Sequence, residues 1–396
     1  MHIFFVAFLP NLLNSADHPI FPGASKKIEF LLSTLANDGH RITLINSSEV
    51  YSSKLEFVNT QISISSENRW LESFHIAAAS KTKFSRLRSI FKSPDLFDFV
   101  VKKRGKPDVL WCYNAYAFEM RLSCYSYHKY LVPSILEFED WHFSRTSFLR
   151  IRPKLLLDYA LWKLAVQTGA IKYCFAVNSY LESLMTRQGV PTKLLPGVVK
   201  ESLCNPCHSA YISGCPTAVN CGYFGGLTEE KGALFVGELI EYFMSESVSV
   251  KWHIAGTGEL DKIFVDLSRR YSQNVCYYGY LSDEEYEKVL STVDVVLNPH
   301  KRMPGVFPFK IVESVAAGKL VISTPLDIPR SLQWMRSSLI QRKLDISLWS
   351  KEILSANIYK SQNRSLMQLS RSQALSMYSR SGVSRMVSKS LAYVCG

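Results

Sequence analysis

The sequence predicts an α/β fold made of two Rossmann-like domains, each built on a parallel sheet. Short apolar stretches alternate with amphipathic helical stretches along most of the chain, which is typical of parallel sheets covered by helices. The alternation stops between residues 200 and 216 and then resumes. We therefore expect a first domain over residues 1–200, a second over residues 201–376, and a last helix over residues 377–396 that packs back on the first domain.

The composition is that of a globular protein with room for two cores. The chain has 396 residues, of which 47% are hydrophobic and 20% are charged. No apolar run reaches the roughly 18–20 residues that a membrane span needs. The start, MHIFFVAFLPNLL, lacks a cationic region and a small-residue cleavage site, so it fits a buried strand better than a signal peptide. We expect a cytoplasmic protein.

The net charge of +12 is concentrated in the first half of the chain. A basic surface favours an anionic partner, such as phosphate groups, a membrane surface or nucleic acid. The sequence contains no zinc-finger spacing, no RNP motif and no helix-turn-helix pattern. We therefore predict that nucleic acid is not a partner.

Nine cysteines are scattered without regular spacing, which is typical of reduced thiols in a cytoplasm. One local group has ligand types that suit zinc but no regular second pair, so a linker with incidental cysteines is the alternative. We predict no metal site. The group consists of Cys204, Cys207, His208, Cys215 and Cys221.

The first domain begins with a buried strand over residues 2–9, a loop, an amphipathic helix that stops at Asp38-Gly39-His40, and a second strand over residues 41–45. Gly23 lies in the loop before this helix. Backbone N–H groups there could take a phosphate, although a plain turn explains one glycine equally well. Later elements are expected as strands over residues 108–113, 132–138 and 173–177 and as a helix over about 150–168.

The segment from Lys81 to Lys106 is strongly basic. It carries nine basic residues against Asp95 and Asp98, with aromatic and aliphatic residues interleaved. Such a helix suits the surface of an anionic membrane and would place the protein peripherally on the inner face. A helix that packs on the core and carries a solvated basic rim is the alternative.

The predicted strand over residues 132–138 runs into Glu139, Asp140 and His142. Carboxylates and an imidazole at the carboxyl end of a strand are placed for general acid-base catalysis or for orienting a substrate. We therefore take these three residues as catalytic candidates. The alternative is that Asp140 caps a helix and that His142 lies on the surface.

Two glycine-bearing loops follow predicted strands of the second domain. A strand over residues 217–224 leads to Gly225 and Gly226, and a strand over residues 250–255 leads to Gly256 and Gly258. Because the carboxyl ends of parallel strands meet at one sheet edge, these loops are expected to converge there.

Two helix starts are visible in the same domain. Lys231 stands where a helix opens, and Ser282 to Glu285 form a capping box for a later helix. The residues of the first helix expected to face inward are Leu234, Phe235, Leu239 and Ile240.

Residues 293–324 form a strand, loop, helix and strand in succession, with Gly318 as the helix stop. The first turn of this helix carries Lys310 and Glu313. An ammonium group at a helix start suits a phosphate, and a carboxylate one turn later can accept hydrogen bonds from ribose hydroxyls. A solvated Lys/Glu pair on an ordinary helix is the alternative.

Four stretches of the second half read YFGGLTEEKG, WHIAGTGEL, CYYGYLSDEEYEKVLSTVDVVLNP and FPFKIVESVAAGKLVIST. In order and spacing they resemble the donor-binding domain of GT-B glycosyltransferases, of the group 1 or family 4 type. The first half is similar more loosely, through FPGASKKIEFLLSTLANDGHRITLI and AVNSYLESLMTRQGVPTKLLPGVV. The resemblance implies two Rossmann-like domains that face a cleft.

The resemblance also implies roles for individual residues. Glu313 matches the ribose-binding glutamate of the family, Lys231 matches the lysine that neutralises the donor diphosphate, and Gly23 falls in the loop that faces the diphosphate. The predicted donor-binding residues are Gly23, Gly225, Gly226, Lys231, Gly256, Gly258, Lys310 and Glu313.

The sequence departs from the family pattern at two positions. Gly226 stands where the family often has an arginine, and we expect Lys310 to supply the missing charge. Gly305 stands where the family has a glutamate that is usually tied to the transferred sugar. These departures leave open an alternative, an inactive GT-B pseudoenzyme that acts as a binding or assembly partner.

The activity that the resemblance implies is a hexosyltransferase, retaining and metal-independent. It would move a sugar from a UDP- or GDP-sugar to a hydroxyl of a glycan or lipid-linked glycan, in the biosynthesis of a surface polysaccharide or glycoconjugate. No cofactor is expected besides the nucleoside-diphosphate sugar, which is a co-substrate.

Overall fold

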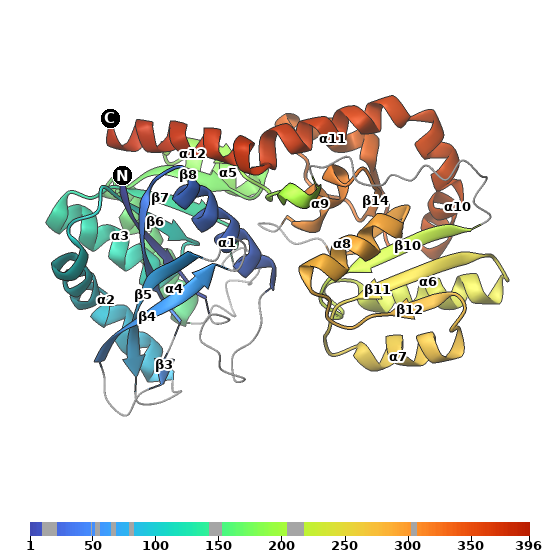
Figure 1. The fold of residues 1–396 in the computed structure, drawn as a ribbon, viewed down its shortest axis with the longest axis horizontal. Helices are drawn as coiled ribbons and strands as arrows, with labels where there is room; N and C mark the ends of the chain where they lie inside the picture. The colour runs from blue at the N-terminus through green and yellow to red at the C-terminus, as the bar shows by residue number, and fades with distance from the viewer. Residues whose placement is uncertain are drawn as a thin grey trace. The chain divides into compact units, whose positions relative to one another are not determined.

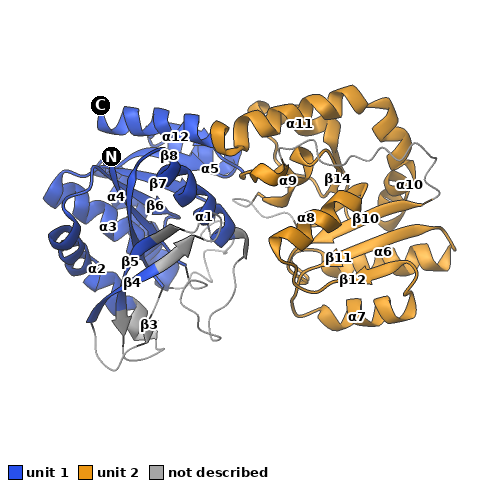
Figure 2. Cartoon of the chain, viewed as in Figure 1, with its two compact units in different colours: residues 1–196, 304–306, 383–396 blue, residues 197–303, 307–382 orange. Residues whose placement is uncertain are grey.

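The computed structural model of the chain forms two compact units (Figures 1 and 2). Unit 1 takes residues of 1–196 and 383–396, and unit 2 takes residues of 197–303 and 307–382. Each unit has its own sheet of mainly parallel strands, so the predicted α/β fold with two parallel-sheet domains is confirmed. The residues that the structure describes are 1–9, 22–48, 50–51, 56–64, 69–78, 83–141, 153–203, 218–301 and 307–396.

Unit 1 is built on a nine-stranded sheet with the order β3-β5-β2-β1-β6-β7-β8-β9, in which β4 pairs with β5. The central strand β1 is buried on both faces, because a parallel strand between two layers of helices meets side chains on each side. The strands are β1 His2–Ala7, β2 Arg41–Asn46, β3 Val50–Tyr51, β4 Glu56–Ile64, β5 Arg69–Ala78, β6 Val109–Tyr113, β7 Ser134–Phe138, β8 Ile171–Ala176 and β9 Thr192–Leu194. The helices are α1 Pro22–Asn37, α2 Lys83–Arg104, α3 Ala117–Tyr130, α4 Pro153–Gln167, α5 Ser179–Thr186 and most of α12 Arg380–Cys395.

The strands β4 and β5 form an antiparallel pair in a stretch where the sequence predicts no element. The polar residues Asn59, Thr60 and Gln61 follow one another in the middle of β4. A half-exposed strand at the edge of a sheet lacks the continuous apolar run by which the buried strands are recognised. This is why the antiparallel pair has no signal in the sequence.

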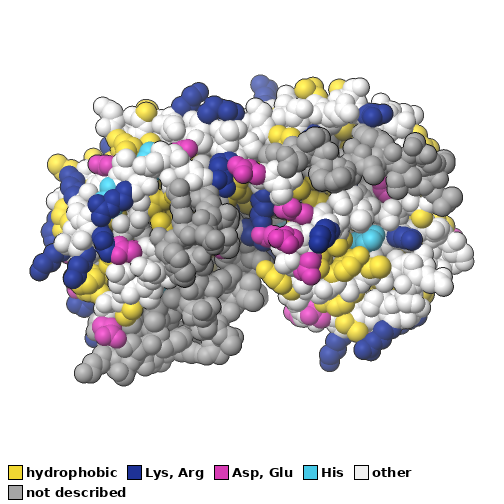
Figure 3. All heavy atoms as spheres, viewed as in Figure 1, with side chains coloured by type: hydrophobic (Ala, Val, Ile, Leu, Met, Phe, Trp, Pro, Cys, Tyr) yellow, Lys and Arg dark blue, Asp and Glu magenta, His cyan; other side chains and the backbone are white. Residues whose placement is uncertain are grey.

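Helix α2 packs on the core of unit 1 through buried Ile90, Leu96, Phe97 and Val100. This favours the core-packed alternative for the basic segment, whose first residue, Lys81, lies outside the described residues. Phe91 stays 56% exposed, and the Arg121 guanidinium lies 5.1 Å from its ring centroid. Basic side chains gather at this edge of unit 1 in the space-filling view (Figure 3). Membrane contact therefore stays a prediction.

The C-terminal helix α12 contacts unit 1 over its second part. The Ser384 hydroxyl donates a hydrogen bond to the Asp38 carboxylate at 2.9 Å, and the Tyr393 ring lies 6.0 Å from the Tyr173 ring. None of the helices within the described ranges combines the length and apolar character that crossing a bilayer requires.

Unit 2 is built on a six-stranded parallel sheet with the order β12-β11-β10-β13-β14-β15. The chain moves outward from β10 to β12, returns to the other side of β10 at β13, and moves outward again. The strands are β10 Val219–Phe224, β11 Val250–Ala255, β12 Val275–Tyr277, β13 Val295–Asn298, β14 Leu320–Ser323 and β15 Leu339–Gln341. The helical elements are η4 Glu201–Leu203, α6 Ala233–Ser245, α7 Asp261–Arg270, α8 Asp283–Thr292, α9 Lys310–Ala316, η5 Arg330–Ser338, α10 Ile346–Gln362 and α11 Arg364–Tyr378.

This strand order creates a topological switch point between β10 and β13. In open parallel sheets, ligands bind outside the carboxyl ends of the strands at such a point, because the connections leave in opposite directions there. The loops that follow β10 and β13 begin at Gly225 and Pro299. The fold of unit 2 alone therefore selects these two loops as the place to look for a site.

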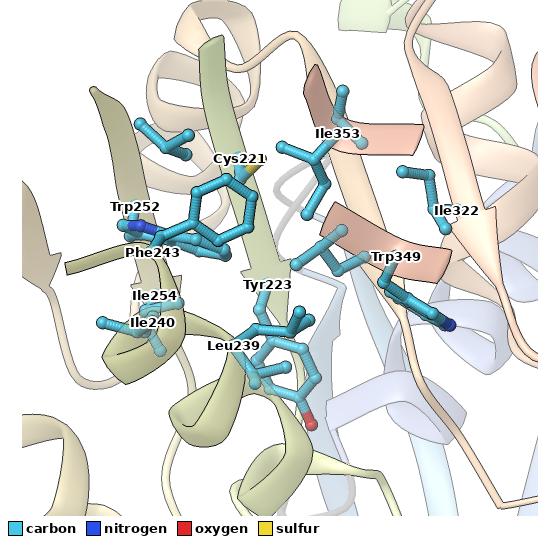
Figure 4. Packing of buried hydrophobic residues seen from close by; sticks show 14 of the residues in the cluster. Cys221, Tyr223, Leu239, Ile240, Phe243, Trp252, Ile254, Ile322, Trp349 and Ile353 are labelled. Carbon is cyan, nitrogen blue, oxygen red and sulfur yellow. The ribbon is translucent and has the colours of Figure 1, made fainter. Parts of the chain in front are cut away.

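The core of unit 2 lies between the sheet and helices α6, α7 and α10 (Figure 4). Trp252 of β11 meets Phe243 edge to face at 5.5 Å, and Trp349 of α10 meets Phe235 at 5.2 Å. Tyr223 of β10 is also fully buried in this core. Because the core holds β10 from one face, it fixes the position of the loop that follows.

Two local predictions for unit 2 have clear outcomes. The capping box is confirmed: the Ser282 hydroxyl accepts from the Glu285 N–H at 3.3 Å, and the Glu285 carboxylate accepts from the Ser282 N–H at 2.8 Å. The inward position of Leu234 is wrong, since this side chain is 41% exposed. The helix begins only at Ala233, after Gly232, so its buried face runs through Phe235, Val236, Leu239, Ile240 and Phe243 instead.

Candidate functional site

Lys310 begins helix α9 and reaches the carboxyl end of β10. Its ammonium group donates a hydrogen bond to the carbonyl oxygen of Phe224 at 3.1 Å and lies 4.6 Å from the centroid of the Tyr223 ring. Burial, and to a smaller extent the charge of nearby Lys231, together lower the pKa of Lys310 to about 7. Within the described residues, Lys310 forms no ion pair with a carboxylate. A cation held in this way is ready for an anionic ligand.

Lys231 is held by His300, which follows β13. The Lys231 ammonium nitrogen lies 3.0 Å from His300 Nε2, and His300 Nδ1 lies 2.7 Å from the carbonyl oxygen of Lys301. A carbonyl can only accept, so Nδ1 carries the ring proton and Nε2 accepts from Lys231. Burial, reinforced by the Lys231 charge, lowers the pKa of His300 to about 4. The ring is therefore neutral at physiological pH.

The glycine loops after β10 and β11 are joined by main-chain hydrogen bonds. The Gly225 N–H donates to Ala255 O at 3.0 Å, the Leu227 N–H donates to Thr257 O at 3.0 Å, and the Gly256 N–H donates to Gly279 O at 2.8 Å. The Gly258 N–H donates to the Asp261 carboxylate at 2.6 Å. Three of the predicted glycines therefore use their N–H groups within the protein.

The absence of side chains is what these glycines contribute. At Gly256, where φ is 142°, a Cβ would lie 1.8 Å from the carbonyl oxygen of Gly225, so only glycine lets the loops approach. A Cβ at Gly225 would lie 3.7 Å from the Lys310 ammonium, and one at Gly226 would lie 3.9 Å from Lys231 Cγ. The Gly225-Gly226 pair thus lies beside both lysines.

Tyr223 connects the core of unit 2 to this loop. Its ring is fully buried, and its hydroxyl lies 2.9 Å from Gly226 O and 3.3 Å from Lys231 O. A phenol has one proton to donate, so the shorter contact is the stronger candidate for the hydrogen bond. The backbone from Gly226 to Lys231 is thereby fixed by a core residue.

Glu313 lies one turn after Lys310 on α9 and next to Tyr286 of α8. Burial, and then the negative charge of Glu313, raise the pKa of the Tyr286 phenol well above its ordinary value. The Tyr286 ring in turn meets Phe224 edge to face at 5.2 Å. The structure thus places Lys231, Lys310 and Glu313 around the carboxyl end of β10, while their ligand-binding roles stay predictions.

In unit 1 the structure places Glu139 in a buried charge cluster. The ammonium group of fully buried Lys27 pairs with Glu137 at 2.6 Å and with Glu139, and donates to Leu195 O at 2.8 Å. The contacts with Glu139 and Leu195 O are hydrogen bonds, whereas the contact with Glu137 is an ion pair without hydrogen-bond geometry. The pKa of Lys27 is raised by the two carboxylates despite its burial. Glu139 thus has a structural partner that the sequence reading missed.

The other first-domain candidates lie nearby or outside the described residues. The Asp140 N–H donates to the Asn114 side-chain oxygen at 3.2 Å. The predicted position of Gly23 in the loop before the helix is wrong, because α1 begins at Pro22 and Gly23 lies in its first turn. His142 and Gly305 lie outside the described residues, as do Cys204, Cys207, His208 and Cys215. Cys221 is buried in β10. The catalytic roles of Glu139, Asp140 and His142 stay predictions.

Lys27 and His300 were both visible in the sequence as signals that were not used. Lys27 stands four residues before Leu31, so it lies on the same face of the predicted helix as a core residue. His300 comes two residues after β13, which borders the switch point. A charged residue on an apolar helix face, and a polar residue at a switch-point strand end, are each reasons to look for a partner.

Comparison with known proteins agrees with this geometry. Residues 218–355 match the family model described as "Glycosyl transferases group 1". No curated protein matches the sequence.

Among solved structures, sucrose-phosphate synthase from Thermosynechococcus elongatus has a TM-score of 0.73 at 13% identity, over 98% of this chain and 97% of that chain. Anabaena HepE, solved in complex with UDP, has a TM-score of 0.66 at 12% identity, over 99% and 100%. The catalytic domain of starch synthase IV from Arabidopsis thaliana, bound to ADP and acarbose, has a TM-score of 0.63 at 11% identity, over 100% and 99%.

At identities this low, the structural likeness shows a shared fold and no more. The likeness covers residues of both units. The family match adds sequence evidence for the part of the chain that contains Lys231, Lys310 and Glu313. The fold that the four motifs imply is thereby confirmed, and the part of the chain that contains these motifs matches the group 1 model. The chain has the GT-B fold, and its residues 218–355 match the group 1 glycosyl transferase model.

Proposed function

We propose that the protein binds a nucleoside-diphosphate sugar at the carboxyl edge of the unit 2 sheet and transfers the sugar to a hydroxyl of a glycan or lipid-linked glycan. UDP- and GDP-sugars are the expected donors. The observation that carries this proposal is the pair of ammonium groups at the switch point, Lys310 on the carbonyl of Phe224 and Lys231 on the ring of His300.

The chemistry of sugar transfer explains why two cations suit this place. Breaking the bond from the anomeric carbon to the diphosphate leaves negative charge on the departing phosphate oxygen. Preorganised ammonium groups stabilise that charge without rearrangement at the moment of reaction. Lys231 and Lys310 would hold the diphosphate, and Glu313 would accept hydrogen bonds from the ribose hydroxyls. In the first domain, Glu139, Asp140 and His142 remain our candidates for general acid-base catalysis or for orienting the substrate.

Thermal unfolding with and without nucleotide tests the binding half of this proposal. A ligand at 100 times its dissociation constant adds about 2.7 kcal/mol of stability, so UDP or GDP should raise the unfolding temperature measurably. Lys310→Met should abolish this shift. Lys301→Met is the matched control, because Lys301 is half-exposed and pairs with Glu229 at the surface. The absence of any shift with UDP, GDP or their sugars would contradict the proposal.

Release of free nucleotide from the sugar donor tests the transfer half. Gly226 at the position of a frequent family arginine supports a second candidate function, a protein that binds the nucleotide sugar without transferring it. Binding with no release in the presence of glycan acceptors would favour this second candidate over the enzyme.

We further propose that unit 1 meets an anionic membrane surface through the basic edge at α2. Exposed Phe91 and the basic side chains Lys102 and Lys103 at the end of this helix support it. Co-sedimentation with phosphatidylserine vesicles should be reduced by Lys102→Glu with Lys103→Glu. Equal sedimentation of both proteins would refute the membrane contact.

A further inference from the structure

We infer that His300 is a positioning residue, which holds the Lys231 ammonium group at the place where it meets the diphosphate of the donor. The inference rests on the proposed function, since it assigns how one part of that site is organised. Its observations are the hydrogen bonds on either side of the His300 ring and the anchoring of the segment that carries the ring.

The first observation is that the ring can serve Lys231 in one form only. His300 Nδ1 is committed as a donor to Lys301 O at 2.7 Å, so the lone pair on Nε2 points to the Lys231 ammonium at 3.0 Å. The ring is 6% exposed, so water does not compete strongly for Nε2. A hydrogen bond between a charged donor and a buried neutral acceptor is stronger than one at the surface.

The second observation concerns the charges that face the ring. Lys231 from the loop before α6 and Lys310 from α9 both disfavour a proton on Nε2, whereas Glu230 favours it. The two cations lower the pKa of His300 more than the one carboxylate raises it, and burial lowers it as well. His300 therefore remains an acceptor, and it leaves the positive charge of Lys231 undiminished for a ligand.

The third observation is that the His300 backbone is anchored on two sides. The Thr324 hydroxyl at the end of β14 donates to His300 O at 2.5 Å, and the Lys301 N–H donates to Glu230 O at 3.1 Å. The ring thus belongs to a segment tied both to the sheet and to the loop that carries Lys231. A Cβ at Gly232 would lie 2.1 Å from Pro299 O, which shows how closely the two segments approach.

The consequence for Lys231 is a loss of freedom before any ligand arrives. A lysine side chain has several rotatable bonds, and ordering it costs conformational entropy. An acceptor that already holds the ammonium group removes part of this cost from ligand binding. His300 therefore acts through Lys231 and makes no contact with the ligand itself.

Two substitutions separate the donor and acceptor functions of the ring. His300→Asn keeps an N–H donor near the position of Nδ1, so it can still bind Lys301 O, but it has nothing at the position of Nε2. His300→Gln can place its side-chain oxygen near the Nε2 position and accept from Lys231. We expect His300→Asn to weaken binding of UDP or GDP about tenfold in isothermal titration calorimetry, and His300→Gln to restore most of the affinity.

A double-mutant cycle with Lys231→Met distinguishes positioning from general support of the fold. If His300 acts through Lys231, adding His300→Asn to Lys231→Met produces no further loss of affinity. An equal loss in both backgrounds, or an unchanged affinity for His300→Asn in the otherwise natural chain, would overturn the inference. Both of these outcomes require that the natural chain binds UDP or GDP, so they are distinct from failure of the proposed function, which is an absence of binding by the natural chain. Thermal unfolding of each variant confirms that it is folded.

Discussion

The carboxyl edges of the two sheets use their lysines in opposite ways. At the edge of unit 1, fully buried Lys27 is paired with Glu137 and Glu139, and its pKa is raised. At the edge of unit 2, Lys310 rests on a carbonyl oxygen, and its pKa is lowered to about 7. The first lysine neutralises charges that the fold has buried, whereas the second lacks a carboxylate to neutralise it within the described residues.

The two edges are also joined by different interactions. In unit 1, one ammonium group links α1 to the end of β7 and to Leu195 after β9. In unit 2, main-chain hydrogen bonds between glycine loops join the ends of β10, β11 and β12. Because the backbone organises the second edge, Lys310 is not used there to neutralise a buried carboxylate of the described residues. This difference suggests why the unit 2 edge is suited to binding an anion.

Removing the Lys27 charge should have the largest effect on stability. Lys27→Met leaves two buried carboxylates without their cation, and breaking a buried ion pair in this way costs about 3–5 kcal/mol. The free energy of unfolding, measured by urea denaturation, should fall by that amount. Lys92→Met is the matched control in unit 1, since its pair with Asp95 is half-exposed and should contribute less than about 1 kcal/mol.

An effect of Lys27→Met no larger than that of Lys92→Met would break the comparison. Burial raises the pKa of the Glu137 carboxyl, although the Lys27 charge lowers it. Protonation of Glu137 removes one of the two buried negative charges, so it reduces the loss of stability in Lys27→Met. The deficit of the variant should therefore be smaller at pH 5 than at pH 8.

Gly256→Ala, which adds one methyl group to the unit 2 edge, should lower the stability by an intermediate amount. Gly256→Ala forces a Cβ against Gly225 O and a side-chain residue into a φ of 142°. Strain of this kind costs about 1–3 kcal/mol and should displace the loop beside Lys310. Gly279→Ala is the control, because φ there is 65° and the space around its Cβ is open. Its cost should be about 1 kcal/mol, with nucleotide binding unchanged.

Melting curves recorded with and without UDP compare the two alanine variants. If Gly256→Ala melts like the natural chain and binds UDP as well, the close approach of the two loops does not support the site. Loss of UDP binding by Gly279→Ala would show instead that binding depends on any substitution in these loops and not on the close approach at Gly256 in particular.

The protonation of Lys310 should make nucleotide binding depend on pH. A phosphate favours the charged form, so binding raises the pKa of Lys310 from about 7. Below pH 7 the ammonium group is already charged, and the dissociation constant should be flat. Above pH 7 binding must take up a proton, so the dissociation constant should rise by up to tenfold for each pH unit. Calorimetry in buffers of different ionisation enthalpy measures this proton uptake directly.

Lys310→Arg is the control for this pH dependence. A guanidinium stays charged throughout this range, so the variant should bind UDP or GDP with an affinity that is independent of pH between 7 and 9. The same slope in both proteins would assign the proton uptake to another group.

The fold was largely readable from sequence because most of its strands are buried and apolar. The unit from β13 to β14 is the clearest case: an apolar strand, a helix and the stop at Gly318, where φ is 74°, all follow from local chemistry. The β4–β5 pair was missed because β4 shows neither a continuous apolar run nor a strict alternation, since Asn59, Thr60 and Gln61 are three polar residues in succession. β15 was missed as well, since only three residues form it and the surrounding chain is helical.

The candidate site was readable where its residues lie next to the ends of predicted elements. Lys310, Glu313 and the glycines of both loops have such positions. The partnership of Lys231 with His300 spans 69 residues, and that of Lys27 with Glu139 spans 112. Local periodicity carries no information about which distant side chains meet, so these contacts required the structure.

Tyr223 gives rigidity to the loop at the carboxyl edge of the unit 2 sheet, which neither lysine could provide. Its ring is surrounded by the aromatic and aliphatic interior of unit 2, while its single oxygen atom ends among the carbonyls of Gly226 and Lys231. Because the interior is close-packed, the Tyr223 ring has little freedom to move, and its phenol oxygen therefore restrains the loop from Gly226 to Lys231, which consists mostly of small and polar residues. The glycines alone would leave this loop flexible, whereas its contact with the hydrophobic core of unit 2 keeps it ordered.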